Sequence, residues 1–246
     1  MKMHSIVKPH KAFVAICCVA IFFFIISIVL FFHGGYPQRI IARFSPPKQI
    51  EFTATYNNKV LDAWNNCLTQ LHVDADVVFF GDSITRRGSF DKYYPDKKIC
   101  NLGIGSNTIV DMTDRVDMIE LVSPEKVFVM GGINSLRDNT LEQSVSEYDT
   151  LLKEISEKSF SEVFIISVLP ISTDKSTALG LSTNTIVSFN NSIKALADKY
   201  GFQYIDLHSK YVDSNGYINQ AMTYDGVHLT DNAYQIWINE ISSFMN

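Results

Sequence analysis

The chain has 246 residues, of which 46% are hydrophobic, 12% aromatic and 19% charged, so it is too apolar for a disordered protein and long enough for one domain plus an appendage. The net charge is −5, and residues 33–246 alone carry 18 basic and 26 acidic side chains. An acidic domain of this kind, without a cluster of lysines and arginines, argues against nucleic-acid binding.

The first predicted element is a transmembrane helix over residues 12–32. These 21 residues contain no charge and a single hydroxyl, that of Ser27. A helix of this length spans about 30 Å, which matches the hydrocarbon core of a bilayer. The alternative is a cleaved signal peptide, whose apolar region is shorter and ends in small residues, whereas here Phe31 and Phe32 close the run. We therefore expect an uncleaved signal anchor.

Charge on either side of this segment predicts its orientation. Lys2, Lys8 and Lys11 crowd the short N-terminal side, and no acid lies among them. The positive-inside rule then places residues 1–11 in the cytoplasm and everything after residue 32 outside a cell membrane. Secretion after cleavage remains the alternative localisation.

Residues 33–73 read as a stem followed by a lead-in helix. Gly34-Gly35 and Ser45-Pro46-Pro47 interrupt any periodic pattern, and an apolar helical face then runs from Val60 to Leu71. Cys67 lies on this face. In an oxidising compartment it could pair with Cys100, although burial of both as small apolar side chains is the simpler interpretation.

From residue 74 onward, short apolar runs alternate with helical periodicities. Continuous apolar strands that alternate with helices are typical of a parallel sheet covered on both faces, so residues 74–246 are predicted to form one α/β domain. The predicted strands are Val77 to Phe80, Ile99 to Leu102, Val127 to Met130, Val163 to Val168 and Phe202 to Leu207. The predicted helices carry apolar faces over residues 109–119, 141–155, 186–200 and 233–244, the last with Thr230 as N-cap.

Polar residues and glycines directly follow the predicted strands. Ligands bind at this position, beyond the carboxyl ends of the strands, in open α/β sheets. Gly81-Asp82-Ser83 follows the first strand, Gly103 the second, and Gly131-Gly132-Ile133-Asn134 the third. Asp225-Gly226-Val227-His228 precedes the last helix. Each motif taken alone is as compatible with a loop as with a site, and their joint placement is what favours catalysis.

These residue types supply the parts of a serine nucleophile and its support. A serine hydroxyl needs a base, and Asp225 and His228, three residues apart, can lie on one side of a turn with the imidazole toward Ser83. The N–H groups of Ser83 and Gly103 and the side-chain amide of Asn134 are the candidate oxyanion donors. No Cys/His spacing or second acidic cluster predicts a metal.

Three residues near these motifs could bind substrate, but ordinary surface or packing roles are the simpler interpretation. Arg86 and Arg87 follow Ser83 directly, but surface arginines on a first helical turn are commoner than substrate clamps. Tyr224 could stack on a sugar, although packing is the more ordinary role for a tyrosine.

These motifs resemble those of the SGNH/GDSL hydrolases, the GDSL-like lipase/acylhydrolase family, from about Asp76 to the C-terminus. The resemblance implies a three-layer, flavodoxin-like α/β/α domain with strand order 2-1-3-4-5 and no cofactor. It also implies Ser83 as nucleophile, Asp225 and His228 as its partners, and Gly103 and Asn134 in the oxyanion hole. The family's third motif often has aspartate after the asparagine, where this chain has Ser135.

The expected function is therefore hydrolysis of an acyl ester through an acyl-serine intermediate. An O-acetylated envelope glycan or a lysophospholipid would be a suitable substrate for a domain held at a membrane by residues 12–32. The runner-up is an acyltransferase that passes the acyl group to a sugar hydroxyl. A non-catalytic glycan-binding domain is a third alternative, disfavoured because Ser83, Asp225 and His228 are all present.

Overall fold

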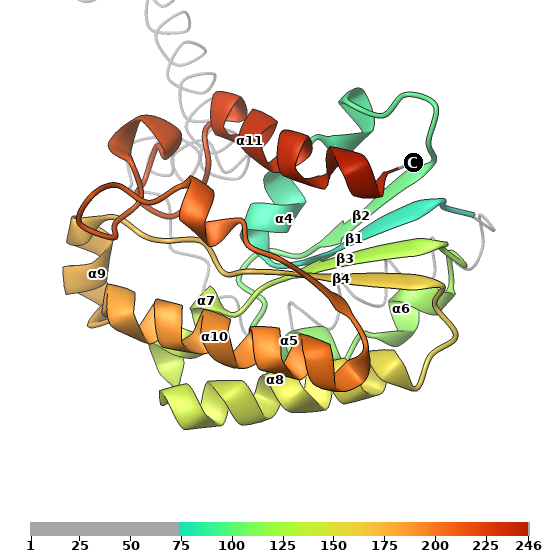
Figure 1. The fold of residues 1–246 in the computed structure, drawn as a ribbon, viewed down its shortest axis with the longest axis horizontal. Coiled ribbons are helices and arrows are strands. Elements are labelled where there is room, and N and C mark those ends of the chain that lie inside the picture. Colours follow the sequence, from blue (N-terminus) through green and yellow to red (C-terminus); the bar gives the residue numbers. More distant parts are fainter. Residues whose placement is uncertain (1–73, 246) are drawn as a thin grey trace, which may run out of the picture. The chain divides into compact units, whose positions relative to one another are not determined.

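The five apolar runs form the strands of one parallel sheet in the computed structural model, which describes residues 74–245 (Figure 1). Each strand begins and ends within two residues of its prediction. The strands are β1 (Val77–Gly81), β2 (Ile99–Gly103), β3 (Lys126–Met130), β4 (Glu162–Ile166) and β5 (Gln203–Ile205).

The strand order is β2-β1-β3-β4-β5, as predicted for a flavodoxin-like sheet. From β1 the chain first forms β2 on one side of β1, and it then crosses back to form β3 on the other side. This reversal makes the carboxyl end of β1 a topological switch point, where ligands bind in open α/β sheets. In the sheet register, Gly81 at the end of β1 lies beside Gly103 of β2 and Met130 of β3.

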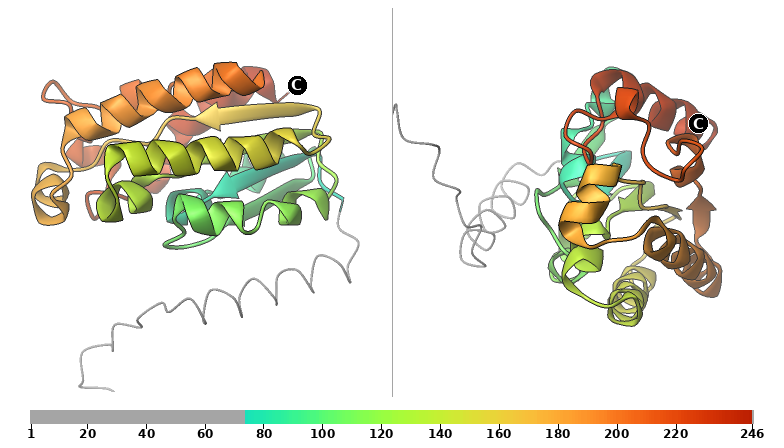
Figure 2. Two further views of the ribbon diagram at one scale, coloured as in Figure 1. Left: turned by 90° about the horizontal axis from the view of Figure 1, so that it is seen from below. Right: turned by 90° about the vertical axis from the view of Figure 1, so that its left-hand side faces the viewer.

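Helices cover both faces of the sheet (Figures 1 and 2). Alternate strand residues belong to two apolar cores, one on each face of the sheet. Val78 and Phe80 face helices α5 (Ile109–Thr113), α8 (Leu141–Ser156) and α10 (Thr183–Tyr200), whereas Phe79 packs with Trp237 of α11 (Asp231–Ile241) on the opposite face. The helices are α4 (Ser83–Arg87), α5 (Ile109–Thr113), α6 (Asp117–Glu120), α7 (Ile133–Asp138), α8 (Leu141–Ser156), α9 (Thr173–Leu179), α10 (Thr183–Tyr200) and α11 (Asp231–Ile241). Short 3₁₀ helices cover Phe90–Lys92, His208–Lys210, Gln220–Met222 and Ser242–Phe244.

The helices differ from the prediction in two places. The apolar face over residues 109–119 belongs to two short helices, α5 and α6, and Arg115 lies between them with its side chain buried. Helix α9 was not predicted, because none of its residues is buried and it therefore has no apolar face to read. The predicted N-cap of α11 is confirmed, since Thr230 accepts the N–H of Ala233.

Several predictions lie outside the described residues: the cytoplasmic segment 1–11, the anchor 12–32, and the stem and lead-in helix 33–73 with Cys67. No helix within residues 74–245 is both long and apolar enough to cross a membrane. Cys100 is half-buried on β2, and burial raises the pKa of its thiol to about 11.

Candidate active site

Ser83 is the first residue of α4, immediately beyond the carboxyl end of β1. Asp82 caps this helix, and its Oδ1 accepts the N–H of Ile84 at 2.9 Å. Gly81 is required at the strand end because a Cβ there would lie 2.1 Å from the carbonyl oxygen of Met130 on β3. The turn from β1 into α4 therefore holds Ser83 at the switch point of the sheet.

His228 lies on a loop that is tied down on both sides. Thr223 Oγ1 donates to the carbonyl of His228 at 2.8 Å and accepts the N–H of Gly226 at 2.9 Å. Gly226 has a φ of +87°, and its carbonyl accepts the N–H of Ser172 at 2.8 Å. A Cβ at Gly226 would lie 2.2 Å from Ser172 Oγ, so only glycine fits both the backbone conformation and the space.

The structure brings Ser83, His228 and Asp225 together as predicted. His228 Nε2 lies 2.9 Å from Ser83 Oγ, and His228 Nδ1 lies 2.6 Å from Asp225 Oδ2. The other carboxylate oxygen of Asp225 accepts the backbone N–H groups of Val227 and His228 at 3.0 and 2.8 Å.

The carboxylate of Asp225 orients the imidazole of His228 so that Nε2 faces Ser83. Burial raises the pKa of Asp225, but hydrogen bonds from the backbone N–H and the side chain of His228 and from Val227 outweigh it and bring the pKa to about 2. Asp225 is therefore ionised at neutral pH and accepts the Nδ1 proton, which leaves Nε2 as acceptor for the Ser83 hydroxyl.

Asn134 lies in the first turn of α7, on the same cleft as Ser83 and His228. Its Nδ2 donates to the backbone carbonyl of Asn107 at 2.9 Å. A side-chain amide has two N–H groups, so one bond to Asn107 leaves a second donor for a ligand. The neighbouring Ser135 is buried, and its hydroxyl accepts the N–H of Ile109 at 2.9 Å, so it supports the loop where the family often has aspartate.

The prediction that Gly103 donates to an oxyanion is wrong in this structure. Its N–H donates to Asn101 Oδ1 at 2.9 Å, and Gly103 does not line the cleft. A Cβ at this position would lie 2.2 Å from the backbone nitrogen of Arg86. The glycine is needed because α4 packs directly on the end of β2, where Asn101 Nδ2 also donates to the carbonyl of Thr85.

Ser106, on the loop that follows β2, lies at the cleft to which Gly103 was predicted to contribute. It lines the cleft with Ser83, Asn134 and His228, and its φ of +64° is rare for a residue with a side chain. Its N–H has no hydrogen-bond partner within residues 74–245. The sequence offered no clear signal for this residue, because a left-handed conformation is expected of glycine and not of serine.

Arg115, which sequence reasoning also missed, braces the loop that carries Ser106. It is 2% exposed, and its guanidinium donates to the carbonyls of Gly81 and Leu102 and to Asn107 Oδ1 at 2.6, 2.7 and 2.6 Å. Burial lowers the pKa of Arg115 to about 9, and burial raises the pKa of Asp82 to about 6 against the opposing effects of the Ile84 N–H and Arg115. Arg115 thus stays charged at neutral pH and joins the ends of β1 and β2 to Asn107.

The cleft has a volume of about 360 Å³, within the usual range for a small-ligand site. Within residues 74–245, no group of three or more His, Cys, Asp or Glu side chains is placed to hold a metal ion. The geometry is that of a nucleophile, a base with its orienting carboxylate, and N–H donors beside them.

Comparison with known proteins agrees with this geometry. A sequence model of the GDSL-like Lipase/Acylhydrolase family matches residues 79–236. No curated protein sequence matches the chain.

Solved structures share the fold at low sequence identity. A Streptococcus pneumonia protein named after platelet activating factor is 18% identical, with 82% of this chain and 100% of that chain covered and a TM-score of 0.68. A GDSL-like lipase from Bacteroides thetaiotaomicron is 22% identical over 76% of this chain and 96% of that chain, with a TM-score of 0.63. An acetyl xylan esterase is 22% identical over 69% of this chain and 99% of that chain, with a TM-score of 0.57.

Proposed function

The chain belongs to the GDSL-like lipase/acylhydrolase family, and on that premise we propose that it hydrolyses acyl esters through an acyl-Ser83 intermediate. The observation that carries the proposal is the hydrogen-bonded series Asp225–His228–Ser83, with contacts of 2.6 and 2.9 Å. Ser83 is the nucleophile, His228 the general base and acid, and Asp225 the group that orients the imidazole.

In the first half of the reaction, His228 Nε2 takes the hydroxyl proton while Ser83 Oγ bonds to the ester carbonyl carbon. The carbonyl becomes a tetrahedral oxyanion. When its C–O bond to the alcohol breaks, His228 returns the proton to the departing alcohol oxygen. In the second half, His228 removes a proton from water, the water oxygen attacks the acyl carbon, and Ser83 leaves with the proton while the carboxylic acid is released.

The oxyanion donors of this proposal are the backbone N–H groups of Ser83 and Ser106 and the second N–H of Asn134. All three residues line the same cleft. Their support is rigid, because Arg115 and Asn134 both hold Asn107, the residue after Ser106. Donors that are fixed before the reaction stabilise a developing charge without reorganisation.

A fluorophosphonate probe and a chromogenic acetate test the function together. We expect the wild-type protein to take up one phosphonyl group per chain, on Ser83, and to release 4-nitrophenolate from 4-nitrophenyl acetate. An absence of both labelling and turnover in correctly folded protein would contradict the proposal. Formation of an acylated sugar at the expense of free acetate, when sugar acceptors are added, would instead identify the acyltransferase.

Acylated glycans and lysophospholipids are the substrate classes that we propose for the ester. The fold is shared with an acetyl xylan esterase, which supports the first class only at the level of fold. The volume of the cleft suits the reacting end of either molecule.

We also propose that residues 12–32 hold the catalytic domain on the outer side of a membrane, on the strength of their uncharged sequence. In cells that express the full chain, the protein should sediment with membranes and resist extraction by high salt, while detergent releases it. A chain of residues 33–246 should remain soluble. Recovery of a mature protein that begins after residue 32 would overturn the anchor in favour of a cleaved signal peptide.

A further inference from the structure

The cleft around Ser83 is positively charged although the chain as a whole is negative. Its lining includes four cationic side chains and no carboxylate, against a net charge of −5 for the whole sequence. The four are Arg86, Arg87, Arg137 and Lys175. Charge gathered at one cleft against the sign of the molecule attracts ligands of opposite sign to that cleft.

Three of these cations have no partner of opposite charge. Arg137 is bound by the adjacent Asp138, whose Oδ1 accepts from its Nε at 2.6 Å. Within residues 74–245, no salt bridge forms to Arg86, Arg87 or Lys175. Asp174, next to Lys175 in the chain, is exposed and does not line the cleft. A substrate therefore meets charges that the protein itself leaves unpaired.

Two of the three lie beside the His228 loop. The Lys175 stem packs against Gly226, where a Cβ would come within 2.7 Å of its Cγ. The Arg87 guanidinium lies over the ring of Tyr224, 5.1 Å from its centre, and that ring stacks on the imidazole of His228 at 5.9 Å and 14°. Tyr224 is 54% exposed, so it faces the solvent and not the core.

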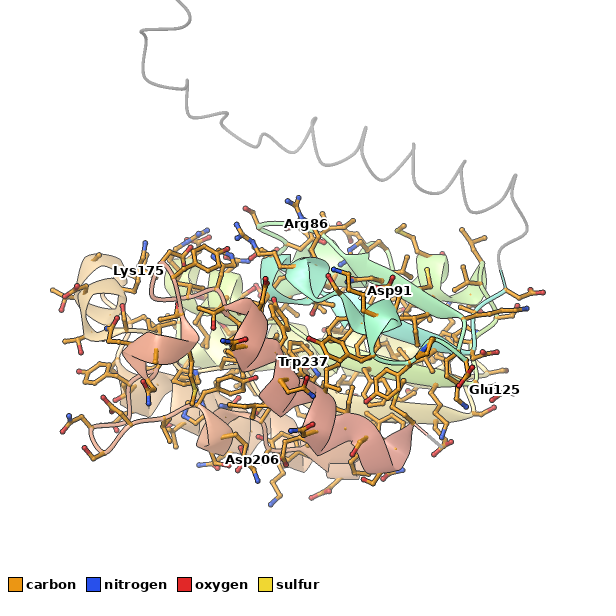
Figure 3. All side chains as sticks on the ribbon, turned by 90° about the horizontal axis from the view of Figure 1, so that it is seen from above. Arg86, Asp91, Glu125, Lys175, Asp206 and Trp237 are labelled. Atoms are coloured by element: carbon orange, nitrogen blue, oxygen red, sulfur yellow. The ribbon has the colours of Figure 1, made fainter. Side chains whose placement is uncertain are left out.

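Arg86 lies near the loop that carries Ser106. A Cβ on Gly105 would lie 3.3 Å from Arg86 Nη1. Figure 3 shows Arg86 and Lys175 along the same edge of the molecule. Arg87 and Lys175 thus lie beside the loop of His228, the residue that must protonate the departing alcohol, and Arg86 extends the positive surface to the loop that carries Ser106.

We propose that the enzyme selects esters whose alcohol part carries an anionic group, a phosphate or a carboxylate, which Arg87 and Lys175 receive beside His228. The proposal rests on the hydrolase function above and adds the substrate class. Asp225 does not oppose it, because two backbone N–H groups and the imidazole already bind its carboxylate. An acidic glycan and a lysophospholipid both present such a group.

A matched pair of esters measures this preference in the full chain, purified in a nonionic detergent. The anionic member is 4-acetoxy-3-nitrobenzoate and the neutral member is its methyl ester. The measured quantity is the ratio of kcat/KM for the anionic ester to that for the neutral one, each corrected for its rate with hydroxide. We expect this ratio to fall about 2- to 25-fold in the double variant Arg87→Gln, Lys175→Gln, since each exposed charge contributes a factor of about 1.4 to 5.

A second double variant separates the effect of charge at the cleft from the effect of the net charge of the protein. The variant Lys98→Gln, Lys194→Gln also removes two positive charges, but from exposed positions that do not line the cleft. Its ratio of kcat/KM for the anionic ester to that for the neutral ester should equal that of the wild type. Raising the salt concentration from about 0.1 M to about 1 M shortens the Debye length from about 10 Å to about 3 Å. This should lower the wild-type ratio more than that of the Arg87, Lys175 variant, in which only Arg86 and Arg137 of the four cleft cations remain. An unchanged ratio in that variant would overturn the proposal.

Binding of the product alcohols tests the same idea without turnover. The anionic 4-hydroxy-3-nitrobenzoate should bind the wild-type cleft more tightly than its methyl ester by calorimetry, and the difference should shrink in the Arg87, Lys175 variant. If no ester is turned over and Ser83 is not labelled, the hydrolase function fails, while the binding difference still decides the anion preference. Equal binding of the two alcohols would contradict that preference even in an active esterase. The same pair of measurements with glycerol-linked phosphate esters and with uronic acid esters would distinguish the two sources of charge.

Discussion

Ser83→Ala should lower kcat for an acetyl ester by about 10⁴-fold or more and abolish fluorophosphonate labelling, with little change in Tm. The acyl-enzyme cannot form without the hydroxyl, and the remaining catalysis comes only from binding and oxyanion donors. The hydroxyl lies in the cleft and contributes to no apolar core, so the free energy of unfolding should change by less than about 0.5 kcal/mol.

His228→Ala should cause a loss of similar size, and the double variant should be no worse than either single one by more than a few-fold. Members of a triad act as a unit, because removing one leaves the others without a role. Ser89→Ala is the matched control, since this serine follows α4, makes no cap hydrogen bond and does not line the cleft. Losses that multiply in the double variant would mean that Ser83 and His228 are not partners, despite their 2.9 Å contact.

The parts of the site that sequence could predict are those whose function is set by a local motif. Ser83 follows a readable strand and begins a helix, and Asp225 and His228 are three residues apart on one loop, so residue type and spacing were enough. The apolar strands were predicted for the same reason, because continuous burial on both faces leaves a continuous apolar run. Their order came from the family resemblance and not from the pattern itself.

The parts that could not be predicted depend on contacts between distant segments. Gly103 looked like a ligand-facing glycine, but its small size serves the approach of α4, a contact that only the folded sheet creates. Ser106 adopts a positive φ within a loop that Arg115 braces from nine residues further along the chain, and neither residue type signals that conformation. The charge of the cleft was underestimated for a similar reason. Arg86 and Arg87 were taken for surface arginines, and only the docking of the His228 loop on Ser172 brings Lys175 of α9 to the same cleft.

Asn134→Ala provides the sharpest test of the oxyanion hole, because the structure gives this side chain two possible roles. Its amide already donates to Asn107, which alone would make it a loop support. If its second N–H also stabilises the oxyanion, that interaction exists mainly in the transition state, so kcat should fall about 100- to 1,000-fold with KM nearly unchanged. Loss of the bond to Asn107 should add a decrease of about 1–3 kcal/mol in the free energy of unfolding, seen as a Tm lower by several degrees.

Asn134→Asp separates the two roles, because aspartate keeps the size of the side chain but replaces its donors with a negative charge. As an oxyanion donor, Asn134 should tolerate aspartate less well than alanine in kcat, since the added charge repels the developing one. As a loop support only, the two variants should share a lowered Tm and keep kcat within a few-fold of the wild type. Asn139→Ala is the matched control: its amide donates to Glu147 at 2.7 Å at the far end of α7, outside the cleft, so kcat should not change. A normal kcat in both Asn134 variants would leave the oxyanion to the backbone N–H groups of Ser83 and Ser106, and the left-handed conformation of Ser106 would then be the feature on which the transition state depends.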